Sequence, residues 1–292
     1  MRIRLAPAAA AALCALIAVP VLASEPSSEH DPNSGRPLPP DKRHLTPSPI
    51  NDRFYAEGIY YPAHVKTDIR VDPHNAPANV IGTSLRAEEA LGLESRVNYG
   101  LPELMFRFGN RNKIRVDWLD VDRSATHPLA QTINFGNETF LVNALTASSI
   151  DWRIFTVTYT YSIIHNDRME LGTGLAVHLL QAEARASIAA TEQRQDVTGA
   201  GAFPTVPLDF ALRISRRWSV TARAQYFHAS INNFDGWLAD YHEDVQYRWK
   251  PNFSLGLGYS SVRAKLALHT GNFPGEFAMS LEGPTAFFRV SF

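Results

Sequence analysis

The chain has 292 residues, and its 28 lysine and arginine residues nearly balance its 29 aspartate and glutamate residues. This balance, without an arginine-rich run interleaved with aromatic residues, argues against nucleic acid as a partner. The mean hydropathy is −0.18, and no run of about 18 apolar residues follows the N-terminal segment, which excludes membrane-spanning helices from the rest of the chain.

The first 23 residues have the order of a secretory signal peptide. Two arginines within residues 1–4 precede an apolar run over 5–18, Pro20 ends that run, and residues 21–23 offer small residues for cleavage. Cys14, the only cysteine, lies inside the apolar run. We therefore expect a mature chain without cysteine, which has no disulfide, thiolate zinc site or cysteine nucleophile.

Residues 24–51 are polar and rich in proline, and we expect a flexible N-terminal extension that buries too little apolar surface to fold. The alternation of apolar and polar side chains starts at residue 52. Over 218–226, the even positions carry Trp, Val, Ala, Ala and Tyr, whereas the odd positions carry Ser, Thr, Arg and Gln. This period of two indicates β-strands whose faces meet different environments. Glu243 interrupts the apolar face of 236–249 for no reason that the sequence supplies.

A soluble β-sandwich alternates in the same way, but three features favour an all-β transmembrane barrel. The strands approach the length needed to cross a bilayer, aromatic residues lie near strand ends, and tight turns alternate with longer links such as 123–148 and 187–204. We expect an antiparallel up-and-down barrel of about ten strands, with eight and twelve as alternatives because 72–100 is ambiguous. The predicted strands are 53–71, 101–108, 113–122, 149–164, 168–186, 205–215, 218–231, 236–249, 252–268 and 275–292.

The chain ends with Phe288, Val290 and Phe292 on one strand face. This ending resembles the C-terminal signature of Gram-negative outer-membrane β-barrel proteins and points to no single subfamily. The resemblance implies that periplasmic chaperones and the barrel-assembly machinery recognise the chain, and that outer-membrane lipid and lipopolysaccharide surround it. An even number of strands then places both termini in the periplasm.

The alternation places charges of both signs inside the barrel. Because isolated buried charge is costly, we expect an ion-pair network that largely fills the lumen, in a structural or binding protein whose external loops are the contact surface. The alternative is a narrow channel for small polar solutes. Gly256 and Gly258 are expected to make room for bulky lumen side chains. The predicted lumen residues are Arg115, Asp117, Glu170, His178, Arg213, Arg223, Asp240, His242, Asp244 and Arg248.

One enzyme alternative rests on two short motifs, Asp120-x-Asp122 and Asp240-x-His242. They resemble the paired motifs of omptin-type proteases, which implies a histidine that an aspartate orients as a base toward water. Strict alternation turns Asp120 to the lipid face, however, and the surrounding sequence does not resemble that family.

A second enzyme alternative rests on His228-x-Ser230, because alternate strand residues share a face. The motif resembles that of lipid A deacylases, which implies a serine nucleophile activated by histidine, with Glu243 or Asp235 as the acid. The remaining histidines are scattered, so we expect neither a metal site nor a cofactor.

Overall fold

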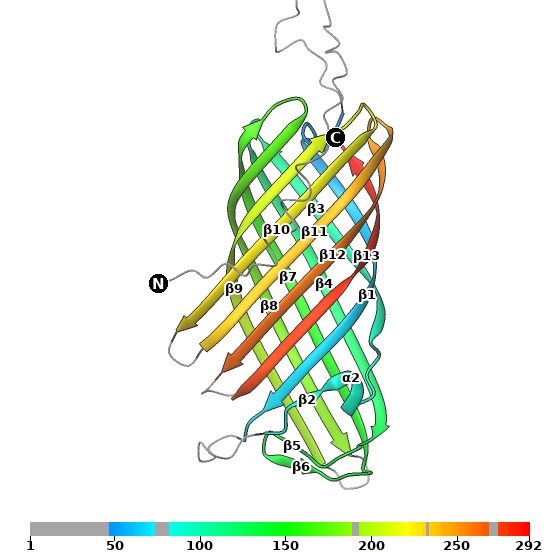
Figure 1. Cartoon of the computed structure of the whole chain (residues 1–292), viewed down its shortest axis with the longest axis vertical. Helices are drawn as coiled ribbons and strands as arrows, with labels where there is room; N and C mark the ends of the chain where they lie inside the picture. Colours follow the sequence, from blue (N-terminus) through cyan, green and yellow to red (C-terminus); the bar gives the residue numbers. More distant parts are fainter. Residues whose placement is uncertain (1–46, 74–81, 189–192, 232–233, 269–273) are drawn as a thin grey trace, which may run out of the picture. The chain divides into compact units, whose positions relative to one another are not determined.

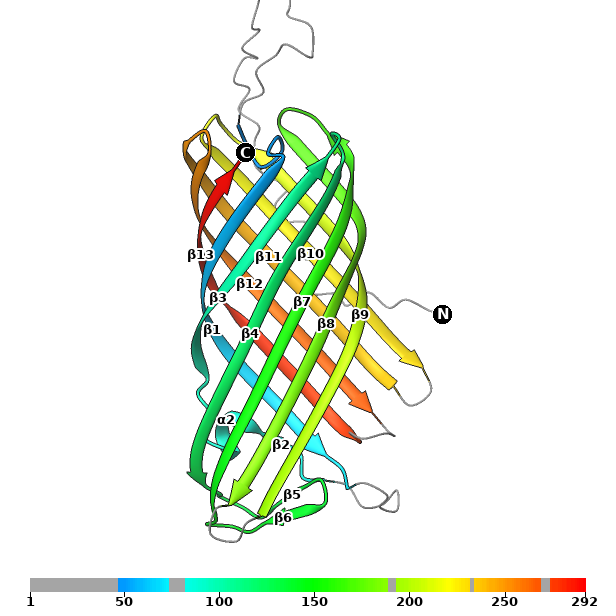
Figure 2. The ribbon, with the colours of Figure 1, turned by 180° about the vertical axis from the view of Figure 1, so that it is seen from behind.

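The computed structural model describes residues 47–73, 82–188, 193–231, 234–268 and 274–292. Within these ranges, ten long antiparallel strands each pair with the next along the chain, and β1 pairs with β13 to close a barrel (Figures 1 and 2). The predicted ten-stranded barrel is therefore confirmed. The ten strands are β1 (Phe54–Val71), β3 (Arg96–Phe108), β4 (Asn112–Pro128), β7 (Leu145–His165), β8 (Met169–Ile188), β9 (Gln193–Arg213), β10 (Trp218–Ile231), β11 (Phe234–Lys250), β12 (Phe253–Leu268) and β13 (Gly275–Ser291).

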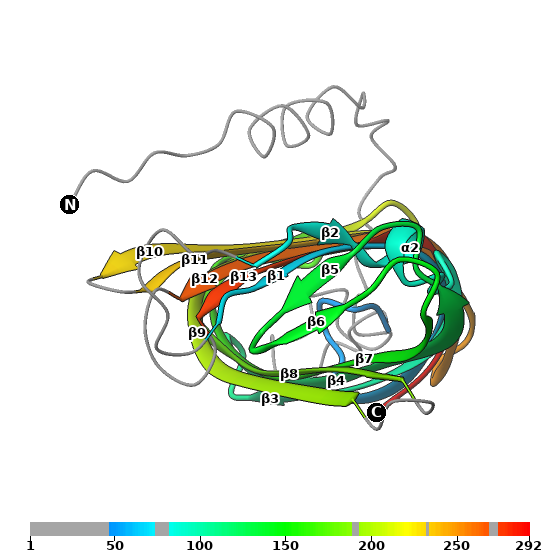
Figure 3. The same cartoon turned by 90° about the horizontal axis from the view of Figure 1, so that it is seen from below.

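The two ends of the barrel differ. At one end, here called the turn end, tight turns join consecutive strands, β1 begins and β13 stops. At the other end, here called the cap end, four short elements lie at the opening: two form a hairpin across it and two lie at its rim (Figure 3). These elements are β2 (Leu85–Arg86), α2 (Ala87–Ala90), β5 (Ile133–Phe135) and β6 (Glu138–Phe140). No helix in the described residues is long and apolar enough to cross a bilayer.

Two predicted long links are shorter than expected. β9 begins at Gln193, so most of the predicted link 187–204 is strand. β4 runs to Pro128 and β7 starts at Leu145, which leaves the β5–β6 hairpin between them instead of an irregular loop over 123–148. The possible extra strand near residue 80 is only the two-residue β2, and residues 74–81 lie outside the described part.

The two faces of the wall exchange their character halfway along the barrel. In the half nearer the turn end, the outward side chains are mostly apolar and the inward ones are mostly polar. In the half nearer the cap, Val65, Trp152 and Leu238 are fully buried inside, whereas Lys66 and Arg153 point outward and are exposed. The expectation of an apolar outside and a charged inside is therefore correct for the turn half and wrong for the cap half. The outward apolar surface of the turn half, here called the belt, includes Tyr60, Leu104, Phe106, Trp118, Phe155, Val157, Leu175, Leu179, Val206, Leu255, Leu257, Tyr259 and Phe288.

The seam between β1 and β13 has a local gap in its hydrogen-bond ladder. The pairing is continuous up to Tyr60 with Ala286 and resumes at His64 with Glu282. Between these pairs Pro62 and Pro284 fall opposite each other, and proline has no backbone N–H to donate. The gap marks the cap-side limit of the belt at this seam.

Candidate functional site: an occluded lumen

The mouth of the lumen at the turn end holds residues 48–52, here called the plug. The amides of Asn51 and Asp52 donate to the carbonyl of Ser48, which forms a tight turn, and Ser48, Ile50 and Asp52 are buried. This segment includes residues that the sequence assigned to a flexible extension; residues 1–46, which contain the predicted signal peptide, lie outside the described part. The plug therefore occupies the opening from which the lumen would otherwise be reached.

Two arginines of the barrel wall hold the plug. Arg248 of β11 forms an ion pair with Asp52, with 2.6 Å between Nη2 and Oδ2. Arg107 of β3 donates to the Asp52 carbonyl at 3.1 Å and to the Pro49 carbonyl at 3.4 Å. Both arginines and Asp52 are buried. Since β3 and β11 lie on different sides of the barrel, these contacts join the plug to both sides.

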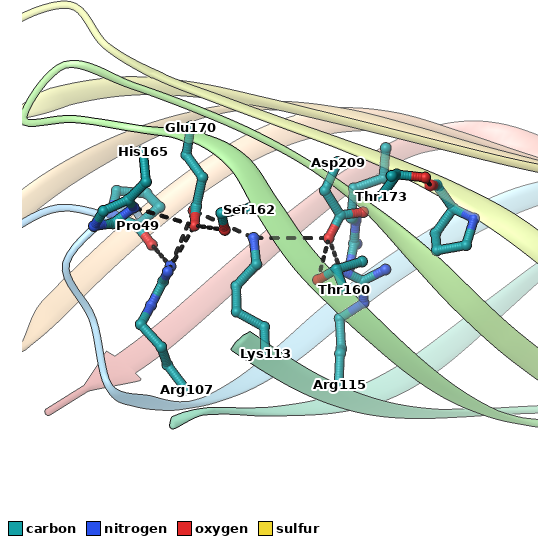
Figure 4. A network of polar contacts seen from close by, with 12 residues as sticks. Pro49, Arg107, Lys113, Arg115, Thr160, Ser162, His165, Glu170, Thr173 and Asp209 are labelled. Atoms are coloured by element: carbon teal, nitrogen blue, oxygen red, sulfur yellow. Dashed lines mark hydrogen bonds and ion pairs between the residues drawn. The ribbon is translucent and has the colours of Figure 1, made fainter. Parts of the chain in front are cut away.

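Above the plug, Glu170 of β8 is the centre of a cluster of cations (Figure 4). Both of its oxygens bind Arg107, at 2.6 and 2.9 Å, in the two-pronged geometry that guanidinium and carboxylate favour. Lys113 lies 3.2 Å from the same carboxylate and 3.8 Å from Asp209, and Ser162 donates to Glu170 as well. Each of these buried charges has an opposite charge beside it, as burial requires.

A second cluster lies deeper in the lumen around Glu103 of β3. Arg223 pairs with Glu103 at 2.6 Å, and the hydroxyl of Tyr55 donates to it at 2.5 Å. Arg115 lies between Glu103, at 4.0 Å, and Asp209, at 3.2 Å. These contacts cross the lumen from β1, β3 and β4 to β9 and β10, and they leave beside them a cavity of about 50 Å³ that Arg115, Asp209 and Arg223 help to line.

The last strand contributes a third buried ion pair. Arg289 of β13 pairs with Glu57 of β1, donates to Gln246 at 3.0 Å, and stacks over the rings of Tyr55 and Phe287. The ring of Phe287 fills the space over Gly256, where an added Cβ would lie 2.1 Å from it. Gly256 thus makes room for a bulky lumen side chain.

A small cavity of about 50 Å³ separates the charged half of the lumen from the apolar half. Asp117, His178, Asp240 and His242 line its polar side, and apolar residues such as Leu119 line the other. His178 hydrogen-bonds Thr156, Thr205 and Gln225. The cavity has room for water. The ion-paired side chains lie on one side of it and the hydrophobic core on the other, so the structure offers no passage for a substrate to these acids and histidines.

In the cap half a hydrophobic core lies between two facing sheets, because the pairing of β9 with β10 ends at Val206 and Tyr226 and that of β3 with β4 ends at Glu103 and Asp117. Trp152, Tyr61, Phe203, Leu238 and Leu281 are among its largest fully buried side chains. The cap adds the apolar side chains of β5 and β6 to the same core. Two sheets whose outer faces are charged need such a core, because buried apolar surface offsets the entropy of ordering their strands.

A buried ion pair holds the cap to the barrel. Arg123 of β4 lies 2.6 Å from Glu88 of α2, and both side chains are buried. Arg123 also donates to Thr67 and, at 3.2 Å, to the carbonyl of Glu94, while the amide of Thr67 donates to Glu88 at 3.0 Å. Three segments that are distant in the sequence are thereby joined at one point.

The predicted lumen residues come together on the inward face. Arg115, Asp117, Glu170, His178, Arg223, Asp240, His242, Asp244 and Arg248 all face inward, and Arg213 is half-buried at the turn end of β9. Sequence reasoning missed Asp52, Glu57, Glu88, Arg123 and Arg289. The alternation along β1 and β13 could have found Glu57 and Arg289, which occupy inward positions, whereas nothing local identified Asp52 or Glu88 as their partners.

The two omptin-like pairs lie apart. Asp120 and Asp122 are on the outer face of β4, where Asp120 pairs with Arg153 at 3.3 Å. Asp240 and His242 face the lumen from β11, on the opposite side of the barrel. The wall of the barrel separates the pairs, so the protease arrangement is not formed.

The deacylase-like residues lie on the outer face of the cap half. His228 and Ser230 are exposed on β10, and Asp235 is the cross-strand neighbour of Ser230. Glu243 pairs in register with Ala222, six residues along the strand from the position of His228, or about 20 Å. Glu243 cannot orient this histidine, and it accepts a hydrogen bond from Tyr241 instead.

The C-terminal pattern lies on the outside of the barrel. Phe288 and Phe292 are 43% and 69% exposed on the outer face of β13. Within the described residues, no group of three or more His, Cys, Asp or Glu side chains is placed to hold a metal ion.

Comparison with solved structures decides the fold class. The outer membrane protease OmpT of Escherichia coli aligns with a TM-score of 0.52 and 10% sequence identity, covering 86% of this chain and 99% of that chain. The chain has the fold of an outer-membrane β-barrel. More distant matches to this barrel include the attachment invasion locus protein Ail of Yersinia pestis (10% identity, 81% of this chain and 97% of that chain, TM-score 0.36) and the toluene transporter TbuX of Ralstonia pickettii (8%, 82% and 90%, 0.37). No protein-family model matches the barrel, and no curated protein matches it.

Proposed function

We propose that this protein resides in the outer membrane as an occluded barrel with a structural or binding role, and that the outer surface of its cap half is the contact surface. The observation that carries the proposal is that both halves of the lumen are filled, by different chemistry. Buried ion pairs and the plug fill the turn half, and a hydrophobic core fills the cap half.

The orientation that we propose places the turn end in the periplasm and the cap outside the cell. Outer-membrane barrels have short periplasmic turns and longer external connections, and the cap elements belong to the long connections. At the β6–β7 connection, Leu141, Val142 and Leu145 are 48–63% exposed. An external apolar tip above a charged wall is suited to contact with another molecule.

A narrow channel is the alternative that the lumen residues left open. A hydrated ion could pass only if pairs such as Arg107 with Glu170 and Arg223 with Glu103 separated, and if the core around Trp152 also opened. Separating buried charges and exposing apolar surface are both costly. The occluded state therefore fits the geometry better than conduction.

Single-channel recording in planar bilayers tests the occlusion. The protein, with insertion confirmed by its heat-dependent mobility on gels, should give no current steps in KCl, whereas an open porin inserted in the same way should give them. Stable current steps from the inserted protein would contradict the proposal.

Single cysteines test the orientation, because the mature chain is expected to contain none. We expect a membrane-impermeant maleimide to label Leu141→Cys in the cap on intact cells. Arg216→Cys at the turn end should react only after the outer membrane is permeabilised. Leu257→Cys, in the belt and 70% exposed on the isolated barrel, should stay unlabelled in both conditions. Labelling of Arg216→Cys alone on intact cells would reverse the assignment.

A further inference from the structure

The two sheets of the cap half separate along the line between β9 and β10. The register of these two strands ends at the pair Val206 and Tyr226, and toward the cap the strands part (Figures 1 and 2). Just beyond the last pair, the rings of Phe203 and Phe227 meet edge to face, with their centroids 6.1 Å apart. From there toward the cap, one edge of β9 has no neighbouring strand among the described residues.

The direction of the β9 backbone groups follows from the register. The amide of Arg213 donates to the carbonyl of Arg168, which lies on the β8 side, and β9 keeps one register with β8 between Gln193 and Leu212. The backbone groups of successive strand residues alternate between the two edges of the strand. Odd-numbered residues of β9 therefore face β8 with their backbone groups, and even-numbered residues face the gap.

Part of this edge carries backbone groups without partners. Toward the cap, the carbonyl of Asp196 accepts a hydrogen bond from the side chain of Gln195 at 3.3 Å, and at the other end Pro204 has no N–H. Between them lies the free edge, whose exposed residues have N–H and C=O groups that bind nothing in the described part of the chain: Thr198, Ala200 and Ala202. Proteins usually protect such edges with charges, prolines or bulges, and 197–202 contains no charge and no proline.

The corresponding gap between β3 and β4 is bridged. Arg123 of β4 donates to the carbonyl of Glu94 at 3.2 Å, and Glu94 belongs to the segment that leads into β3. The edge of β4 also carries Asp120 and Asp122, and charged side chains on an edge oppose the addition of a strand. The gap beside β9 is therefore the one that the described part of the chain leaves open to a partner.

We propose that the free edge binds an extended segment of another protein, which adds a strand to β9. An extended peptide backbone presents N–H and C=O groups at the spacing of alternate edge residues. β10 offers a shorter edge, because within the described residues only His228 and Ser230 face the gap from that side. The inference rests on the proposed function, because that function makes the cap half the contact surface.

The space beside the free edge specifies the side chains of the partner. On the inward side, an added Cβ at Gly199 would have no atom within 4 Å, while Val197 on the same face is buried and Phe227 lies on the other side of the gap. Alternate side chains of an added strand would enter this apolar space. The others would lie outside, beside the uncharged Thr198 and Ala200. The partner segment is therefore extended, uncharged and apolar at every second residue.

A second copy in the same membrane does not fit the free edge. Two copies whose caps lie on the same side of the membrane would be related by a two-fold axis along the membrane normal. Barrel strands tilt by about 45° from that axis, so the two β9 strands would cross at roughly 90° and could not pair as antiparallel neighbours. A segment of a different protein is free of this constraint.

A synthetic peptide tests the inference with detergent-refolded full-length protein. The probe alternates threonine and valine, carries a lysine at each end for solubility, and reports binding through the fluorescence anisotropy of an attached dye. The control peptide has the same side chains and methylated backbone nitrogens, which cannot donate. We expect saturable binding of the probe and binding of the control that is weaker by roughly tenfold or more. Absence of saturable probe binding up to about 1 mM would overturn the inference.

Two proline variants locate the site. Ala200→Pro removes an N–H that faces the gap and leaves the pairing with β8 intact, so it should weaken probe binding by roughly tenfold or more. Thr126→Pro makes the same change on the edge of β4, where Thr126 likewise faces away from the neighbouring β7, and should change binding by less than about threefold. Heat-dependent mobility on gels confirms that both variants are folded.

A photo-crosslink makes the test independent of the folding of any variant. A probe with a benzophenone group at its centre should crosslink the wild-type protein within 193–206 or 226–231, as located by mass spectrometry. Crosslinks within 118–128, equal losses in both proline variants, or a dimer in light scattering that Ala200→Pro dissociates would overturn the inference. The conductance and labelling experiments separate this failure from that of the proposed function. An occluded barrel with an accessible Leu141→Cys and no probe binding contradicts the free edge alone.

Discussion

Gly256 shows how a single position can govern the packing of the lumen. It faces inward on β12, and the ring of Phe287 occupies the place of its missing side chain. Phe287 in turn lies under Arg289, which pairs with Glu57. A side chain at position 256 must therefore displace the ring and disturb a buried ion pair.

We expect Gly256→Val to lower the free energy of unfolding by at least about 2 kcal/mol, since overpacking alone costs about 1–3 kcal/mol. Urea titration of the refolded barrel, followed by tryptophan fluorescence, measures this change. Gly100→Val is the matched control, because Gly100 faces outward on β3 and an added Cβ would have no atom within 4 Å. A similar loss in both variants would show that β-strand glycines matter here only through backbone freedom.

At the scale of single elements, α2 is held by the buried Ala87 and by the buried contacts of Glu88. Its four residues are too few to be stable as a helix alone, and Glu88 connects it to Arg123 inside the barrel. Its neighbour Glu89 also pairs with an arginine, Arg86, but that pair is exposed. Exposed pairs contribute little, whereas buried charges that lose a partner are costly.

Glu88→Gln should therefore loosen the cap. Losing a charged hydrogen bond that contributes about 2 kcal/mol should make the cap open roughly 30 times more frequently. Limited proteolysis would detect this opening as faster cleavage within 82–95. Glu89→Gln removes the same charge from the same helix and should leave the rate within about twofold. If Glu89→Gln accelerated cleavage as much as Glu88→Gln, the buried pair would not be what holds the cap.

The strands were predictable to different degrees, and the reasons are local. β10 and β13 match the predicted ranges within a residue at their bounds, because clean alternation begins at the tight turn before β10 and continues to the chain end in β13. The start of β9 was missed because Gly199, Gly201 and Pro204 are poor strand residues. In the structure, the ring of Phe203 lies beside Gly201, so this glycine serves packing and not a loop.

The exchange of inner and outer faces was missed although the sequence contains it. Along β1 the apolar residues shift from the even positions Phe54 and Tyr60 to the odd positions Val65 and Ile69. A search for alternation alone does not register this shift, because both halves alternate equally well. Glu243 is part of the same transition. It faces outward beside Tyr259 at the edge of the belt, so its hydrogen-bonded carboxylate lies outside the region that contacts acyl chains.

For the molecule as a whole, the exchange of faces sets the height of the membrane. A 21-residue strand such as β7, tilted by about 45°, spans roughly 50 Å, about twice the roughly 25 Å apolar band of an outer-membrane barrel. The remaining height has to stand in water. The charged outer wall and the apolar core of the cap half are what that environment requires, and the apolar outer wall and ion-paired lumen of the turn half are what lipid requires.

Two tryptophans on opposite sides of this boundary test the division directly. Trp118 points outward in the belt and is 51% exposed, whereas Trp152 is fully buried in the cap-half core. In lipid vesicles with brominated acyl chains, a variant that keeps only Trp118 should lose most of its fluorescence, because bromine quenches on contact. A variant that keeps only Trp152 should lose little, since the wall of the barrel and the height above the membrane both separate it from acyl chains. Comparable quenching of the two would mean that lipid covers both halves, which the charged outer wall around Arg153 and Asp120 makes energetically untenable.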